Sequence, residues 1–234
     1  MTRRRKPEAG IPLLLALTAT VPRGADAQRI SSPYEFIEGT HTAAVVVGTV
    51  GEARGELGIG PGGGTLVAGR YGIELRGPLA VDVHGFFVST DRMVFDPVLE
   101  TGLVEIGPAR TLVTGLEARL RFTLTGRRTW YRTAPFVVLG GGIVGDLAGP
   151  PAIEAEVAPE AHFNFGPSFV GVAGTGIRIV ASERIEFRGE VNYRLWKLGT
   201  PVAFRDLDEN LEAPLPEQEW IGPVTFALEA SYSF

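Results

Sequence analysis

The feature that most constrains the fold is an alternation of apolar and polar residues that recurs in segments of about ten residues. It is clearest in residues 185–195, where Ile185, Phe187 and Val191 alternate with charged side chains. Successive side chains of a β-strand point to opposite faces, so the pattern indicates strands with one apolar and one polar face. Helical periodicity is nearly absent, and clusters of Gly, Pro, Asp and Asn separate the segments. The sequence therefore predicts an all-β protein.

Eight full segments can be counted, preceded by a short alternating lead-in at Tyr34–Ile37. We expect strands at Thr40–Val50, Thr65–Arg76, Leu79–Thr90, Thr111–Thr125, Ala134–Asp146, Pro167–Ala181, Ile185–Leu198 and Pro223–Phe234. The connections after the odd-numbered strands are long: Gly51–Gly64, Asp91–Arg110, Leu147–Gly166 and Gly199–Ile221. Those after the even-numbered strands are short: Arg76–Pro78, Gly126–Thr133 and Ser182–Glu183. Up-and-down membrane barrels have an even strand number and sort their loops in this way, whereas a β-sandwich has no reason to. The prediction is an eight-stranded antiparallel up-and-down transmembrane β-barrel.

The N-terminus has the three parts of a secretory signal. Arg3–Lys6 is basic, Ile11–Val21 is apolar, and Ala25–Ala27 is a small-x-small cleavage site. We expect residues 1–27 to be a cleaved signal peptide and residues 28–234 to be the barrel domain. No apolar run of the mature part is long enough for a spanning helix, so it either is soluble or crosses a membrane as strands.

Composition excludes several classes of function. The chain has no cysteine, so disulfides, thiolate metal sites and a cysteine nucleophile are excluded. Of 22 Lys and Arg and 27 Asp and Glu, the signal peptide takes five and two, which leaves 17 against 25 and a net charge of −8. A basic surface for nucleic acid is not expected.

Alternation alone does not say which face points inward. A soluble lipocalin-like barrel places its apolar face inside, and a membrane barrel does the reverse. The polar faces carry both signs in near balance, with Arg70, Arg119, Arg121, Arg178, Arg188 and Arg194 against Glu74, Asp82, Glu117, Glu186, Glu190 and Glu229. A closed interior suits such a set, because unpaired buried charges are costly. Since an eight-stranded barrel is only wide enough for side chains, we expect a salt-bridge network that fills it, with strand glycines making room. The faces of Thr40–Val50 and Ala134–Asp146 stay unassigned.

A family resemblance rests on the signal sequence, the eight alternating segments and the ending Glu229–Phe234, with further likeness in Arg70–Leu79 and Leu120–Gly126. The chain resembles the small outer-membrane β-barrel proteins of Gram-negative bacteria, the OmpA-transmembrane-domain and OmpX-like group. The resemblance implies a place in the outer membrane, contact with its lipid, and recognition of the last strand by the barrel-assembly machinery. The residues that match the assembly pattern are Phe226, Leu228, Tyr232 and Phe234. We expect a monomer.

Two glycine-rich segments invite a nucleotide-binding interpretation. Gly140–Gly145 matches G-x-G-x-x-G, but the prolines that follow prevent the helix such a site needs. Gly60–Gly64 lacks the Lys and Ser/Thr of a phosphate loop. We expect a strand and a loop, and no cofactor.

Histidines and carboxylates offer weak candidates for chemistry. His41, His84 and His162 lie on separate segments, so a metal site is not expected. Ser89 with His84 or Asp91, and His162 alone, are the only catalytic candidates. The acidic run Asp206–Glu219 is interpreted as a solvated loop, with Ca²⁺ binding as the alternative. Aromatic residues near strand ends fit a membrane-interface girdle: Trp130, Tyr131, Tyr193, Trp196, Tyr232 and Phe234.

The functional prediction is a structural or surface protein, for adhesion or envelope integrity, without catalysis. The alternatives are an outer-membrane enzyme acting on lipid or peptide at the outer rim, a small transport barrel, and a soluble lipocalin-like binder.

Overall fold

The computed structural model describes residues 32–37, 39–98, 102–163, 165–205 and 216–234. The expected signal peptide, residues 1–27, lies outside them. The chain divides into two units, residues 1–32 and 33–234. Every strand described belongs to the second unit.

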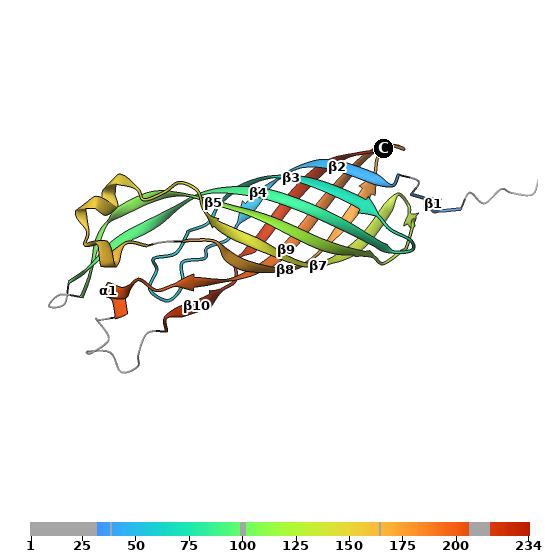
Figure 1. Ribbon diagram of the computed structural model, residues 1–234. Coiled ribbons are helices and arrows are strands. Elements are labelled where there is room, and N and C mark those ends of the chain that lie inside the picture. Colours follow the sequence, from blue (N-terminus) through green and yellow to red (C-terminus); the bar gives the residue numbers. More distant parts are fainter. Residues whose placement is uncertain (1–31, 38, 99–101, 164, 206–215) are drawn as a thin grey trace, which may run out of the picture. The chain divides into compact units, whose positions relative to one another are not determined.

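Eight antiparallel strands close into a barrel (Figure 1). They are β2 (His41–Val50), β3 (Gly64–Glu74), β4 (Leu79–Val98), β5 (Gly102–Thr123), β7 (Thr133–Asp146), β8 (Ser168–Val180), β9 (Ile185–Gly199) and β11 (Val224–Ser233). Each pairs with the next, and β11 pairs with β2, with Leu228 opposite Val47. The predicted eight-stranded up-and-down barrel is confirmed.

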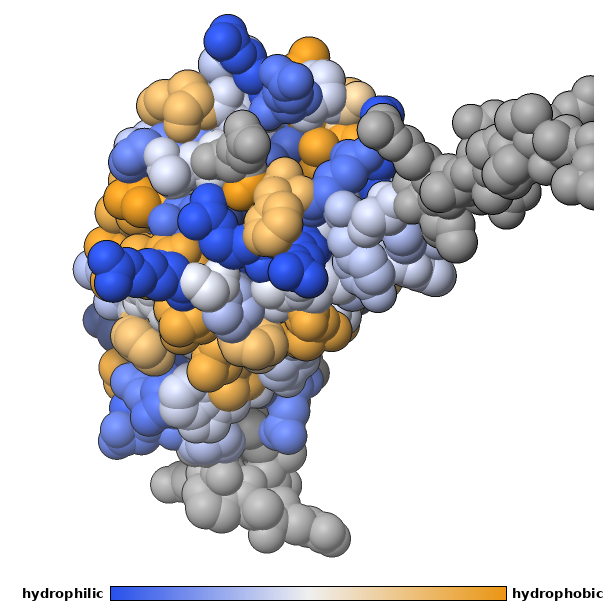
Figure 2. Space-filling view, turned by 90° about the vertical axis from the view of Figure 1, so that its right-hand side faces the viewer, coloured by the Kyte–Doolittle hydropathy of each residue, from blue (hydrophilic) through white to orange (hydrophobic). Residues whose placement is uncertain are grey.

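The connections separate by length between the two ends of the barrel. Three short ones lie at the end that we call the turn end, and the other end, the loop end, carries the long connections after β2, β7 and β9 and the hairpin of β4 and β5. The connection from β5 to β7 contains a further strand, β6 (Arg128–Trp130), which pairs with β1 (Tyr34–Phe36). The alternating lead-in is thus a strand that adds a two-stranded sheet to the turn end. Figure 2 looks onto this end and shows hydrophilic residues gathered over it, with hydrophobic residues on the flanks.

One predicted connection is wrong. Residues 91–110 were expected to be a loop, but most of them continue β4 and β5 as a hairpin beyond the barrel. The register shifts between Val94 and Phe95, so a β-bulge changes the phase of the alternation and hides the strands in the sequence. Pro97 and Pro108 are tolerated because each strand of the hairpin has only one neighbour there.

The long loops pack together around the hairpin at the loop end, in an assembly that we call the head. It contains two 3-10 helices, η1 (Ala152–Glu156) and η2 (Pro159–Ala161), a short helix α1 (Val202–Arg205), and β10 (Gln218–Ile221), which pairs with β9. A separate apolar core holds it together, with buried residues Ile59, Val94, Ala109, Val157, Ala161 and Phe204. None of the helices in the described residues is long and apolar enough to cross a membrane.

The barrel wall has an inverted polarity. Its outward face exposes large apolar side chains, among them Leu120, Leu139 and Leu228, while Arg121 and Arg178 are fully buried inside. The outward apolar residues of β9 run from Ile185 to Leu195, which at about 3.3 Å per residue and a tilt of about 40° spans about 25 Å. That height equals the apolar band of a transmembrane barrel.

The two strands without a predicted face can now be assigned. On β2, Thr42 and Val46 are buried and point inward. On β7, Phe136, Val138 and Val144 point inward, while Leu139 is exposed. On both strands the inward side carries apolar residues as well, so polarity could not distinguish the two faces.

Strand glycines serve both faces of the wall. A Cβ atom on Gly72 would lie 2.3 Å from Asp82 Oδ1 and 2.4 Å from Arg70 Nη1, so this glycine makes room for interior charges. Gly69 and Gly85, in contrast, face outward and meet no interior side chain. The expectation that strand glycines accommodate the network therefore holds for only part of the set.

Candidate functional site

The interior charges are the most extensive polar cluster in the described part of the chain. The structure places all twelve residues of the predicted network on inward-facing positions, from Arg70 and Glu74 on β3 to Glu229 on β11. Each of the six carboxylates lies within ion-pair distance of at least one of the six arginines. The set therefore balances to zero net charge inside a closed wall.

Eight of these residues form a closed ring in which cations and anions alternate. Around the ring they are Arg70, Asp82, Arg121, Glu74, Arg178, Glu186, Arg188 and Glu229, which contacts Arg70 again. The Arg70 contacts to Asp82 and Glu229 are 2.8 and 2.6 Å. Arg188 makes the longest contacts, 3.5 Å to both Glu186 and Glu229. Every member thus has two oppositely charged neighbours, although the buried Nε and Nη2 atoms of Arg188 have no hydrogen-bond partner among the described residues.

The ring crosses the lumen. Glu74 on β3 lies 2.9 Å from Arg121 on β5 and 2.8 Å from Arg178 on β8. Strands β3 and β8 are four positions apart in the eight-stranded wall, so they lie on opposite sides of the barrel. The Glu74–Arg178 ion pair therefore connects opposite sides of the barrel wall and obstructs the lumen.

A second, smaller group lies nearer the loop end. Glu117 binds Arg119 and, at 2.7 Å, Arg194; Arg119 reaches Glu190 at 2.8 Å. His84 Nδ1 lies 3.0 Å from Arg119 Nη2 and 3.6 Å from Glu117. His84 thus belongs to this group and not to the ring that contains Asp82. With two arginines and two carboxylates, the charges of this group also sum to zero.

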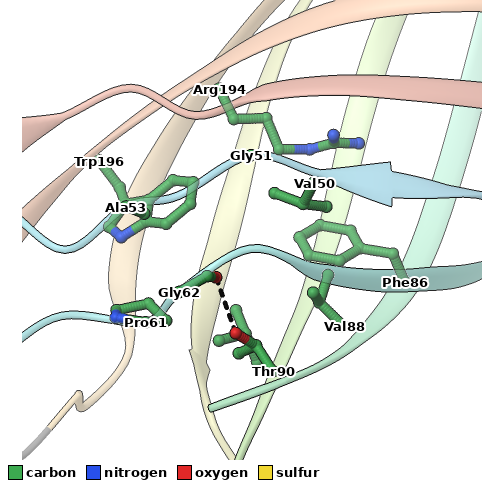
Figure 3. Close-up of a pocket in the computed structure, with 11 residues that line it drawn as sticks. Val50, Gly51, Ala53, Pro61, Gly62, Phe86, Val88, Thr90, Arg194 and Trp196 are labelled. Atoms are coloured by element: carbon green, nitrogen blue, oxygen red, sulfur yellow. Dashed lines mark hydrogen bonds between the residues drawn. The ribbon is translucent and has the colours of Figure 1, made fainter. Parts of the chain in front are cut away.

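Between the charged groups and the loop end, apolar side chains fill the barrel interior. The sequence did not indicate this layer. Phe86, Val88 and Trp196 belong to a buried cluster that fills the lumen toward the loop end. Figure 3 shows an internal gap there, about 20 Å³, beside Arg194 and Trp196, with Thr90 Oγ1 donating to the Gly62 carbonyl at 2.7 Å. A second gap, lined by His84, Arg119 and Glu229 among others, measures about 10 Å³. Each holds at most about one water molecule, so neither accommodates an organic ligand.

Trp196 corrects one expectation. Its side chain is buried in the lumen, so it does not belong to the girdle at the membrane interface. The other five aromatic residues of that prediction are exposed or lie at strand ends.

In the head, one buried ion pair fixes a loop to the hairpin. Arg92 on β4 binds Glu154 of η1, and both side chains are almost fully buried. The Arg92 guanidinium lies 4.9 Å from the centre of the Phe163 ring, and the Phe163 N–H donates to Glu154 Oε1 at 3.3 Å. The β4–β5 hairpin and the connection from β7 to β8 are therefore held together by directional contacts, which sequence spacing could not reveal.

The candidate catalytic residues are not brought together. Ser89 and Asp91 face outward, whereas His84 faces into the barrel. His162 Nε2 contacts the Val157 carbonyl at 3.1 Å. Because a nucleophile must lie within hydrogen-bond reach of its base, none of these combinations can operate in this arrangement.

The metal and nucleotide alternatives find no support in the described residues. No group of three or more His, Cys, Asp or Glu side chains that could hold a metal ion is found among them. Of the acidic run, residues 206–215 lie outside the description; Glu217 lies 3.6 Å from Arg205, and Glu219 accepts from the Glu56 N–H at 2.9 Å. Gly140–Gly145 lies within β7, as expected.

The end of the chain packs at the seam where the barrel closes. The Phe234 ring stacks on His41 at 5.9 Å and lies 6.5 Å from both Tyr71 and Tyr232. Phe226, Leu228 and Tyr232 of β11 are exposed on the outward face. The four residues of the expected assembly pattern thus form one accessible outward strip along the last strand.

Comparisons of the sequence with protein-family models and with curated proteins find no match. Solved structures do match. Neisserial surface protein A (NspA) is 10% identical with a TM-score of 0.52, over 87% of this chain and 98% of its own. Ail, the attachment invasion locus protein of Yersinia pestis, is 13% identical with a TM-score of 0.39, over 84% of this chain and 99% of its own. The chain has the fold of the small eight-stranded outer-membrane β-barrels, as the resemblance implied.

Proposed function

We propose that this chain is an outer-membrane protein whose sealed barrel carries a folded head at the cell surface, and that it serves adhesion or envelope integrity rather than catalysis or transport. The observation that carries the proposal is the ring of eight alternating charges inside a wall whose outward face is apolar. A water-soluble barrel would have the opposite polarity.

The lumen supports the non-transport part of the proposal. The Glu74–Arg178 pair bridges opposite strands, and an apolar layer that includes Phe86 and Trp196 lies above it. Opening a path would require several buried ion pairs to break together, which is costly in a water-poor interior. The barrel therefore acts as a rigid anchor.

The head supports the surface part. Its own apolar core and the Arg92–Glu154 pair give it a defined shape, so it can present a fixed surface to a partner. Binding loops held on a rigid scaffold are a common arrangement for recognition. The partner is a component that reaches the cell from outside or a neighbouring envelope molecule.

Fractionation of a Gram-negative host that expresses the full chain tests the proposal. We expect the mature chain in the outer-membrane fraction, its release by detergent only, and a faster gel migration before heating than after it. In planar bilayers we expect no discrete conductance steps. Recovery in the soluble periplasm would overturn the membrane assignment, and regular conductance steps would overturn the sealed lumen.

A further inference from the structure

The two-stranded sheet at the turn end continues the barrel wall. Trp130 of β6 pairs directly with Thr133 of β7. Directly opposed residues of antiparallel strands share a face, and Thr133 precedes the inward-facing Ala134, so Trp130 points outward. By register, Arg128 on β6 and the β1 residues opposite them point outward too. The outward side of this sheet therefore extends the apolar face of the barrel.

The two faces of the sheet differ. Thr129 on the inward side is 1% exposed, whereas Phe36 and Trp130 on the outward side are 67% and 53% exposed. The outward side is therefore open to a partner, whereas the inward side carries Glu35, which forms a 4.0 Å ion pair with Arg132. We call the outward residues Phe36, Arg128 and Trp130, together with the adjoining turn residues Tyr131 and Arg132, the rim patch.

The rim patch combines aromatic rings with guanidinium groups. The Arg128 guanidinium lies 4.8 Å from the centre of the Phe36 ring, and Trp130 meets Tyr131 edge-on at 5.2 Å. Tyr131 and Arg132 both have positive φ angles, 48° and 61°, as in the type I′ turn that joins a tight hairpin. The turn holds both side chains exposed beside Trp130. Trp and Tyr favour the membrane–water interface, and guanidinium groups bind phosphate.

Charge also favours an anionic partner at this end. Arg76, Arg127, Arg128, Arg132 and Arg184 lie at the turn end, against Glu35 and Glu183 among the described residues. Within the same residues, Arg128 has no carboxylate partner and only its Phe36 contact. In the proposed orientation the turn end lies at the periplasmic leaflet, where phospholipid headgroups carry phosphate.

We infer that the rim patch binds anionic phospholipid of the periplasmic leaflet. Arg128 holds the headgroup phosphate, Arg132, whose Nε lies 4.0 Å from Glu35 Oε2, adds positive charge beside it, and the rings of Phe36, Trp130 and Tyr131 lie at the glycerol level. The site occupies one sector of the barrel rim, beside the start of β7. This inference rests on the proposed membrane location and adds a lipid class and a position to it.

Native mass spectrometry of the detergent-solubilised full chain tests the inference, with phosphatidylglycerol and phosphatidylcholine as probes. We expect the protein to retain phosphatidylglycerol in preference to phosphatidylcholine. In the double variant Arg128→Gln/Arg132→Gln, the apparent affinity for phosphatidylglycerol falls by at least about ten-fold, since each arginine contributes to attraction by an anionic lipid surface. The matched control is Arg110→Gln, an exposed arginine on β5 at the loop end, which should leave retention unchanged.

The outcomes separate the inference from the proposed function. Equal retention of both lipids, or equal loss in the Arg110→Gln control, overturns the lipid site while the chain still fractionates with the outer membrane. Arginine-dependent sedimentation with purified peptidoglycan, without any lipid preference, also overturns it. A chain that is not in the membrane fraction overturns the proposed function itself. The double variant must keep its heat-modifiable migration, so misfolding cannot imitate the expected loss.

Discussion

Glu74 on β3 and Arg178 on β8 form a 2.8 Å ion pair that joins opposite sides of the barrel through its lumen. Glu74 also binds Arg121 at 2.9 Å, so one carboxylate holds two guanidinium groups from different strands. Removing it would leave both cations without their shared partner in a buried environment.

We therefore expect Glu74→Ala to lower the free energy of unfolding by about 3–5 kcal/mol, the usual cost of an uncompensated buried charge. Urea unfolding of the protein refolded into phospholipid vesicles measures this change. Glu183→Ala, at an exposed turn position, is the control and should change stability by less than about 0.5 kcal/mol. The double variant Glu74→Ala/Arg178→Ala should lose less than the sum of the single variants, with a coupling of about 0.5–3 kcal/mol. Equal effects of Glu74→Ala and Glu183→Ala would contradict a stabilising ring.

The outward face gives an independent prediction. Leu120 is exposed on β5, next to the inward Arg119 and Arg121. Leu120→Arg should cost about 2–4 kcal/mol of stability in a bilayer, because it places a cation near the midplane. Leu120→Val, measured by the same vesicle unfolding, should cost much less. A neutral Leu120→Arg would mean that this face meets water.

Sequence alternation predicted the strands of the wall, and the near balance of opposite charges on their polar faces predicted that these faces point inward. Ile185, Phe187 and Val191 followed this rule, and so did the twelve network positions. The rule failed where both faces are apolar, as on β7, where Phe136 points inward and Leu139 outward. It also failed at Trp196, since an aromatic residue suits a lumen or an interface equally well.

The structure of the head and the pairing of charges within the ring could not be predicted from the sequence, for a different reason. A β-bulge beside Val94 shifts the alternation, so the extended hairpin reads as a loop. Which carboxylate meets which arginine depends on strand order and stagger across the lumen. Glu74 and Arg178 are 104 residues apart, and only barrel closure brings them together. For the same reason, the contact between Arg92 and Glu154 could not be predicted from the sequence.

The head can be tested by protease sensitivity. Arg92→Ala removes the partner of Glu154 and the cation over Phe163, so the η1–η2 segment should detach from the hairpin. We expect new cleavage within residues 147–163 under limited proteolysis, while the barrel keeps its heat-modifiable migration. Arg110→Ala, an exposed arginine lower on the same hairpin, serves as the control. An unchanged cleavage pattern would show that the apolar core alone holds the segment.

A substitution of the last residue, Phe234, can distinguish an effect on assembly in cells from an effect on the stability of the folded barrel. Phe234 packs on His41 at the seam, where its contacts are exposed and therefore weakly stabilising. If the outward strip of β11 is recognised during assembly, Phe234→Ala should reduce the folded barrel in cells several-fold but leave refolding into detergent nearly unchanged. The heat-modifiable fraction in each setting measures the effect. Phe169→Ala, another exposed outward aromatic residue, is the control. Equal loss in cells and in detergent would point to packing instead of recognition.

The central claim is that the barrel crosses the outer membrane with its head outside, and labelling of single cysteines tests it most directly. The chain has no cysteine, so Leu103→Cys in the exposed hairpin and Arg76→Cys at the turn end each give one reactive thiol. With a membrane-impermeant maleimide, we predict that Leu103→Cys is labelled in intact cells and that Arg76→Cys is labelled only after the outer membrane is permeabilised. Labelling of both in intact cells, or of Arg76→Cys alone, would contradict this orientation.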